Sequence, residues 1–104
     1  MVKKTFTKHD QDKPAMELLP FVAIEKVAEV LSFGAKKYGE NNWRMVDKPN
    51  RYLGAALRHL VAYGRGEVFD KESGLSHLAH AACCVLFLLE AQECHLGDEG
   101  VKDE

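Results

Sequence analysis

The stretch ESGLSHLAHAACCVLFLLE, residues 72–90, decides the fold of this chain. From Leu78 to Leu89 every residue except His80 is apolar or cysteine. A helix that is hydrophobic around nearly its whole circumference belongs inside a core. Because the run is too short to span a bilayer, it predicts a central helix that the other elements of the domain surround.

Two histidines stand in the first turns of this predicted helix. His77 and His80 lie on one stripe at helical spacing, so both imidazoles point the same way. One interpretation is that each imidazole is a buried structural group that bonds a carbonyl or carboxylate. The other is a metal or acid–base site, because the positive end of a helix favours the neutral imidazole that binds metal. The spacing leaves both interpretations open.

Length and composition limit the class of protein. A chain of 104 residues, 46% of them hydrophobic, predicts a single domain over residues 1–104 with a modest core. Its polar ends, residues 1–12 and 95–104, are expected to be flexible. The net charge of -2 gives no sign of the broad basic surface of a protein that binds nucleic acid polymers.

The sequence also predicts a cytoplasmic protein that does not contact a membrane. Its first residues, MVKKTFTKHDQDK, lack the apolar centre of a signal peptide. The three cysteines are an odd number and two of them are adjacent, which is not the spacing of a disulfide framework. We interpret them as reduced residues that pack in the core.

A first helix is expected from Pro20 to about Tyr38, where Gly39 ends it. Its apolar face recurs at helical spacing and consists of Ile24, Val27, Val30, Leu31 and Tyr38. Glu25 and Glu29 lie one turn apart on another face. They are either a solvated surface pair or one half of a metal site.

The segment GAKKYGENNWR, residues 34–44, has a composition that fits nucleotide binding. Lysine and arginine neutralise phosphate oxygens, and an aromatic face stacks on a base. A helix-to-loop junction in which Trp43 simply closes over the core would contain much the same residues. Composition does not separate the two interpretations.

Another helix is expected to begin at Asn50, its N-cap, and to end at residues 64–66. Its spacing predicts a core face of Leu53, Ala56, Leu57, Leu60 and Val61. Three arginines on the opposite side are either plain surface or contacts for phosphate or a second subunit: Arg51, Arg58 and Arg65. His59 lies between the two faces. The loop GEVFDKE then brings Asp70 and Glu72 to the start of the central helix, where carboxylates are also ordinary capping charges.

Three helices joined by short loops, without an alternating strand pattern, predict an all-α bundle. One helix carries Glu25 and Glu29, and the central helix carries His77 and His80. If these side chains meet, they form a mixed carboxylate and imidazole pocket of the kind in which helical bundles hold metal.

Four segments, in this order, carry a resemblance to a known family: KPAMELLP, VLSFGAKKYGENNWR, RYLGAALRHL and ESGLSHLAHAACCVLFLL. Over roughly residues 13–90 the chain resembles the phage family of dATP/dGTP diphosphohydrolases, N-terminal type, which is linked to the MazG-like all-α NTP pyrophosphohydrolases. The resemblance implies a small MazG-like bundle that is completed by oligomerisation, as a homodimer or a larger assembly. It also implies hydrolysis of dGTP or dATP to the monophosphate and pyrophosphate with a divalent metal. A phage-encoded member would act in the host cytoplasm.

The chain departs from the MazG-like pattern, which holds metal with ExxE on one helix and ExxD on the next. The first motif is reduced here to Glu25 and Glu29, which are four residues apart rather than three. The position that resembles ExxD is filled by His77 and His80. Imidazole ligands favour Mn²⁺ or another transition metal over Mg²⁺.

On this hypothesis the metal, Mn²⁺ or Mg²⁺, is held by some of Glu25, Glu29, Glu72, His77 and His80. The residues expected to act in catalysis are Glu29, His59 and Glu72. Those expected to bind the purine deoxynucleotide are Lys36, Lys37, Tyr38, Asn42, Trp43, Arg44 and Arg58.

Two other classes of function fit the same residues. A non-catalytic protein that sequesters a nucleotide or a nucleotide signal would keep the cationic and aromatic segment and lose the metal. A helical interaction module would use the histidines only for packing, and its melting temperature would not respond to nucleotide.

Overall fold

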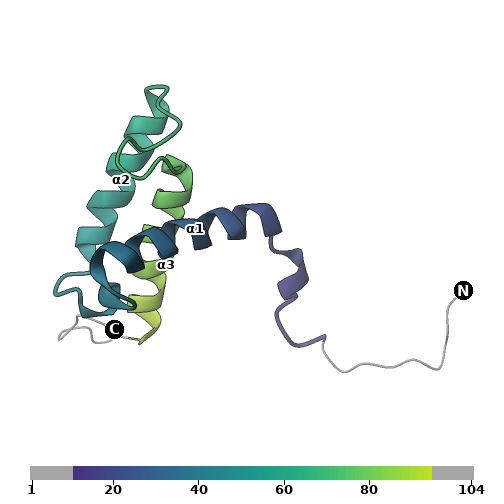
Figure 1. Cartoon of the computed structure of the whole chain (residues 1–104). Helices are drawn as coiled ribbons and strands as arrows, with labels where there is room; N and C mark the ends of the chain where they lie inside the picture. The colour runs from purple at the N-terminus through teal and green to yellow at the C-terminus, as the bar shows by residue number, and fades with distance from the viewer. Residues whose placement is uncertain (1–10, 95–104) are drawn as a thin grey trace, which may run out of the picture.

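The computed structural model describes residues 11–94, which fold into three α-helices and two short 3-10 helices (Figure 1). In chain order the elements are η1 (Met16–Leu18), α1 (Phe21–Tyr38), η2 (Asn42–Met45), α2 (Asn50–Gly64) and α3 (His77–Cys94). Residues 11–94 contain no strand, only an isolated bridge between Phe69 and Ser76. The predicted all-α class is confirmed.

Proline and glycine set the boundaries of α1 and α2. Pro20 precedes α1, and Gly39 ends it at a φ of 98°, which residues with a side chain rarely adopt. α2 begins at Asn50 as expected, but Pro49 occupies the N-cap position and no side chain caps this helix. Pro49 has helical backbone angles, so the chain enters α2 already in the right conformation.

Serine starts the central helix α3. The Oγ of Ser76 accepts hydrogen bonds from the backbone N–H groups of Leu78 (3.0 Å) and Ala79 (3.3 Å). These contacts satisfy N–H groups that have no partner inside the first turn of a helix. His77 is therefore held at a defined position, directly after the cap.

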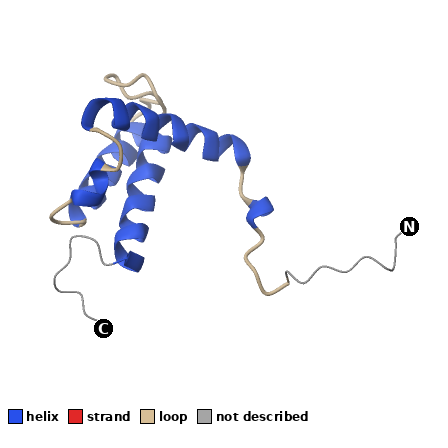
Figure 2. Ribbon diagram, turned by 60° about the horizontal axis from the view of Figure 1, so that its bottom comes forward, coloured by secondary structure: helices blue, strands red, loops and turns tan. Residues whose placement is uncertain are grey.

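α3 is the central element of the bundle, as predicted. α2 packs along α3, and α1 crosses it (Figures 1 and 2). Where α1 meets α3, a core cluster contains Val27 and Val30 from α1 and Ala79 and Cys83 from α3. η2 also contacts α3, whereas η1 lies away from the three long helices (Figure 2).

The bundle buries small residues of α3 and exposes large ones. Besides His77, the buried residues of α3 are Ala79, Ala81, Cys83, Cys84 and Ala91. The exposed large residues of the same helix are Leu78, Val85, Leu86 and Leu89. The expectation that α3 is buried around nearly its whole circumference is therefore wrong for the single chain, because α1 and α2 cover only part of it.

The predicted core face of α2 is wrong except for Ala56, which is 2% exposed. The other members form an exposed row that we call the outer stripe: Leu53, Leu57, Leu60 and Val61. The opposite side of α2 faces α3, where Tyr52 and His59 contact Phe87 and His77. Helical spacing identified an apolar row correctly, but it does not say whether the same chain covers that row.

The predicted face of α1 is only partly buried. Val27 and Val30 lie in the core, whereas Ile24, Leu31 and Tyr38 are exposed. Because α1 crosses α3 instead of running along it, only part of its apolar face reaches the core (Figure 1).

Residues 1–12 and 95–104 are expected to be flexible, and nearly all of them lie outside the described residues. Only Gln11 and Asp12 are described, and both are exposed. Within residues 11–94, none of the helices combines the length and the apolar composition that crossing a membrane requires.

Ala56→Leu is expected to destabilise the protein by about 1–3 kcal/mol, because the larger side chain has to enter the packed interface between α2 and α3. Urea unfolding followed by circular dichroism measures the change. Ala28→Leu makes the same substitution at an exposed position of α1 and should change the free energy of unfolding by less than about 0.5 kcal/mol. Equal stability of the two variants would contradict the small-residue interface.

Candidate functional site

A groove of ≈ 1100 Å³ is lined by α1, η2, α2, α3 and the loop before α3. From α2, the loop and α3 it receives His59, Asp70, Glu72 and His80. From α1 and η2 it receives, among others, Lys37, Tyr38, Asn42 and Trp43. Titratable and aromatic side chains from distant parts of the sequence therefore share one concave surface, which is the usual form of a ligand site.

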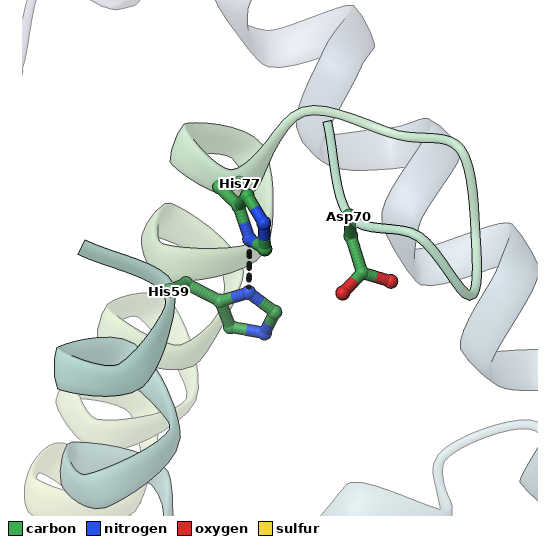
Figure 3. A group of neighbouring side chains, drawn as sticks. All are labelled: His59, Asp70 and His77. Carbon is green, nitrogen blue, oxygen red and sulfur yellow. Dashed lines mark hydrogen bonds between the residues drawn. The ribbon is translucent and has the colours of Figure 1, made fainter. Parts of the chain in front are cut away.

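Three imidazoles meet where α2 packs on the first turns of α3. His59 of α2 and His77 of α3 face each other, with their Nδ1 atoms 2.8 Å apart (Figure 3). His80, one turn after His77, stacks on the His59 ring at a centroid separation of 4.6 Å and an interplanar angle of 11°. Both histidines of the central helix thus contact the histidine of α2.

The loop between α2 and α3 folds back on itself and supplies a carboxylate. The Asp70 N–H donates to the Leu75 carbonyl (2.8 Å), and the Gly74 N–H donates to the Asp70 carbonyl (2.7 Å). Gly74 has a φ of 73°, which this tight turn requires. The Asp70 carboxylate accepts a hydrogen bond from the Ser73 N–H (3.0 Å), and Ser73 Oγ lies 2.8 Å from His80 Nε2. The turn therefore fixes a carboxylate and a hydroxyl beside the imidazoles.

His59, Asp70 and His77 form a possible ligand set for a metal. Each offers one ligand atom, and the three atoms lie within 4.8 Å of one another. In Figure 3 the Asp70 carboxylate lies beside the two imidazoles, carried by the loop. Two imidazole nitrogens and a carboxylate oxygen suit divalent transition metals, so these residues fit the divalent metal implied by the resemblance.

His77 is the most enclosed member of the cluster, at 4% exposure. Its Nδ1 faces His59, and its Nε2 lies 2.9 Å from Glu67 Oε2. Among the described residues, no buried side-chain nitrogen or oxygen lacks a partner. Both nitrogens of this buried ring are therefore engaged, which fixes its orientation.

The protonation states in the cluster favour a bound cation. Burial lowers the pKa of His59, and the neighbouring His80 and His77 lower it further. Burial also lowers the pKa of His80. For Asp70, burial opposes ionisation, but hydrogen bonds from Ser73 and the nearby imidazoles outweigh it and lower the pKa. At neutral pH His59 and His80 are therefore neutral and Asp70 is ionised, as cation binding requires.

Lys37 and Glu72 form an ion pair that links α1 to the loop. Hydrogen bonds to Glu72 and Tyr38 raise the pKa of Lys37, so its amine is cationic at neutral pH. The Lys37 amine also lies 5.1 Å from the centroid of the Tyr38 ring. A positive charge, a carboxylate and an aromatic ring therefore stand together in the groove.

Trp43 closes over the core, which is one of the two interpretations of residues 34–44. Its ring stacks on Phe87 at a centroid distance of 4.5 Å and an interplanar angle of 8°. The Arg44 guanidinium lies 4.3 Å from the centroid of the Trp43 ring and pairs with Glu90 at 3.7 Å. The indole is thus already packed by two neighbours.

Six of the predicted site residues are not part of the groove lining: Glu25, Glu29, Lys36, Arg44, Arg58 and the buried His77. Glu29 is exposed and pairs with Lys26 at 3.4 Å. At about 100° per residue, Glu25 and Glu29 lie on the side of α1 that faces away from its groove-lining residues. Arg58 lies in a separate shallow depression beside Leu57. The expected meeting of Glu25 and Glu29 with the imidazoles therefore does not occur in the single chain.

The loop supplies three residues whose roles the sequence did not indicate. The sequence predicts Asp70 near the start of α3 but not among the ligands, and it predicts no role for Glu67 or Ser73. The segment DKESG does carry a signal, because an aspartate followed by serine and glycine is typical of a turn that folds back on its own backbone. Glu67 has no such signal, since its contact depends on how the loop packs against α3.

The chain is similar to known proteins over most of its length. A family model described as dATP/dGTP diphosphohydrolase, N-terminal, matches residues 3–102. A dATP/dGTP diphosphohydrolase of Salmonella phage PMBT28 is 39% identical over 84 residues, which is 81% of this chain. The chain spans 29% of the length of that relative. No solved structure matches the chain.

The two cysteines in the groove are expected to be unreactive. Burial raises the pKa of Cys83 to about 12 and raises that of Cys84 as well. The thiolate fraction of Cys83 at pH 8 is therefore on the order of 10⁻⁴. With Ellman's reagent the native protein should release one equivalent of thiolate rapidly, from the exposed Cys94.

Unfolding in urea should release the other two equivalents, since the chain has three cysteines. Cys94→Ser should remove the rapid equivalent and leave the slow ones unchanged. Rapid reaction of this variant in its native state would show that Cys83 or Cys84 is accessible and ionised.

Proposed function

Because the chain belongs to the dATP/dGTP diphosphohydrolase N-terminal family, we propose that it hydrolyses a purine deoxynucleoside triphosphate to the monophosphate and pyrophosphate. The resemblance inferred from the sequence is thereby confirmed, whereas the reaction itself is our proposal. One observation carries it: His59, Asp70 and His80 line the same groove as Lys37, Tyr38 and Asn42. Groups suited to a cation and groups suited to a nucleotide thus face one space.

Lys37 is the candidate to neutralise the triphosphate. Its present partner Glu72 is exposed, and exposed ion pairs contribute little to stability. A phosphate oxygen can therefore replace Glu72 at the Lys37 amine at little cost. The released Glu72 carboxylate would then be available to orient a water or accept its proton.

Tyr38 and Asn42 are the candidates to contact the base and sugar. Tyr38 is exposed and lines the groove, so its ring is accessible for stacking. Asn42 supplies both a hydrogen-bond donor and an acceptor. Trp43 would support this wall through its stack on Phe87.

The divalent cation, Mn²⁺ or Mg²⁺, would be held by His59, Asp70 and His77. A cation bound there polarises a phosphoryl oxygen and makes a bound water more acidic. His80 keeps the His59 ring in place by stacking, and Ser73 holds His80 through a hydrogen bond. Glu25 and Glu29, expected as ligands from the sequence, have no part in this arrangement.

Incubation of the protein with dGTP or dATP and either Mn²⁺ or Mg²⁺ tests the reaction, with products separated by anion-exchange chromatography. We expect the deoxynucleoside monophosphate and pyrophosphate. His59→Ala should lower kcat/KM by about 100-fold or more, since even an outer partner of a metal ligand typically contributes 10- to 100-fold. Lys37→Ala should mainly raise KM. No turnover of any purine triphosphate with either metal would reject the proposal.

Two further variants sharpen the assay. Glu93→Ala removes an exposed carboxylate near the other end of α3 and should leave turnover unchanged. Glu25→Ala distinguishes the two ligand sets, because loss of activity in this variant would favour the set expected from the sequence. Nucleotide binding without turnover, unaffected by His59→Ala, would instead identify a protein that sequesters nucleotides.

We also propose that a second copy of the chain covers the outer stripe of α2. Leu53, Leu57, Leu60 and Val61 are all exposed and recur at i, i+4, i+7 and i+8, so they form one continuous apolar row. Continuous exposed rows of this kind mark interaction surfaces. A row along a single helix can pair with its own copy across a two-fold axis.

Leu57→Glu combined with Leu60→Glu should convert a dimer to a monomer, because it places charges in the middle of the apolar contact. Light scattering during size-exclusion chromatography measures the mass, which should fall from twice the chain mass to once. Ala28→Glu adds a charge at an exposed position of α1 and should not change the mass. A wild-type protein that is monomeric at high micromolar concentration would contradict the proposed interface.

A further inference from the structure

The hydrogen bond between His77 and Glu67 determines which nitrogen of His77 is free. A carboxylate can only accept hydrogen bonds, so the proton of the pair belongs to His77 Nε2, 2.9 Å from Glu67 Oε2. A neutral imidazole carries a single proton, and the other nitrogen then has a lone pair. His77 Nδ1 is therefore the nitrogen that can bind a cation, and it is the one that faces His59.

The spacing of the two imidazoles suits a shared cation. Nitrogen ligands lie about 2.0–2.1 Å from a zinc-like cation, so two of them on one cation would be roughly 3–3.5 Å apart. His59 Nδ1 and His77 Nδ1 are 2.8 Å apart, so the two nitrogens need to separate by a few tenths of an ångström to bind one cation. Because His77 Nδ1 has the lone pair, His59 Nδ1–H is the donor of this contact in the metal-free protein, and cation binding moves that proton to His59 Nε2. Asp70 completes the set from the loop, because His59, Asp70 and His77 each have one possible ligand atom within 4.8 Å of the other two.

The donor set selects the class of cation. Mg²⁺ prefers oxygen ligands and retains several waters, whereas imidazole suits later transition metals such as Fe²⁺, Ni²⁺ and Zn²⁺. One carboxylate in the set and a second behind it also balance the charge of a dication. Three protein ligands leave positions open toward the groove, where a phosphate oxygen or water can bind.

From this geometry we infer that His59 Nδ1 and Asp70, which line the groove, and the buried His77 Nδ1 behind them hold a divalent transition metal, with Glu67 as the positioning residue that keeps His77 in the coordinating tautomer. The use of this metal in hydrolysis rests on the proposed function. Glu67 does not touch the metal or the substrate. It acts by holding the proton on Nε2 and by fixing the plane of a buried ring, as carboxylates behind metal-binding histidines do.

Titration of the metal-free whole chain with Co²⁺ tests this inference without an activity assay. Visible absorption reports coordination by nitrogen and oxygen ligands, and calorimetry gives the Kd. His59→Ala should abolish the absorption. Glu67→Ala should weaken Co²⁺ binding by about 10- to 100-fold, while an excess of Mg²⁺ should not displace Co²⁺ from the wild type.

Two conservative variants separate positioning from charge. Glu67→Gln loses the charge but keeps an oxygen that accepts the Nε2–H bond, so its Kd should stay closer to that of the wild type. Glu67→Asp keeps the charge but is too short to reach His77, so its binding should be weakened nearly as much as in Glu67→Ala. These two variants decide the question if Glu67→Ala does not fold, and circular dichroism of each variant checks folding. Glu93→Ala should bind Co²⁺ like the wild type.

Three outcomes test the role of Glu67, the metal site and the hydrolase function separately. Equal Co²⁺ affinity in the wild type and the folded Glu67→Ala and Glu67→Asp variants overturns the role of Glu67. Hydrolysis of dGTP with Mg²⁺ by a wild type that takes up no Co²⁺ overturns the metal site and leaves the proposed reaction standing. Co²⁺ uptake that depends on Glu67, without turnover of any purine triphosphate, supports the site and rejects the hydrolase.

Discussion

The close packing of α2 against the first turns of α3 is the contact on which the rest of the structure depends. Ala56 is almost completely buried, and Ala79, Ala81 and the paired cysteines give α3 a slim surface. Interiors are closely packed, so a leucine in place of these alanines would push neighbouring elements apart. The imidazoles of His59 and His77 can approach to 2.8 Å only because small residues keep the helices close.

That packing makes the polar partners of the imidazoles necessary. A buried ring nitrogen without a hydrogen bond costs on the order of 1–3 kcal/mol, and His77 places two nitrogens in a nearly closed position. His59 and Glu67 satisfy them from opposite sides. The loop that carries Glu67 must therefore fold back onto α3, and the same fold brings Asp70 and Ser73 to the cluster.

Much of the fold follows from the sequence, whereas the site does so only in part. Proline, glycine and the apolar period predict all three helices, and the apolar run in residues 78–89, which only His80 interrupts, identifies the central one. The helical spacing of apolar residues could not show that Leu53, Leu57 and their neighbours face outward. It identifies an apolar row on a helix but not the surface that covers this row. For the same reason the period could not show that Glu25 and Glu29 of α1 lie away from the imidazoles. Asp70 and Glu67 take that place because of a turn whose path depends on hydrogen bonds within the loop and on contacts with α3.

The residues of the cluster lie within one helical hairpin, since His59, Glu67, Asp70 and His77 fall between positions 59 and 77 of the chain. The side chains proposed to contact a base and phosphates come instead from α1 and η2, earlier in the chain. Recombination between related genes at a point just before α2 would therefore exchange one half of the groove and leave the other intact. On the proposed function, descendants of this chain could diversify in the nucleobase they accept while they inherit the same hairpin with its imidazoles and carboxylates.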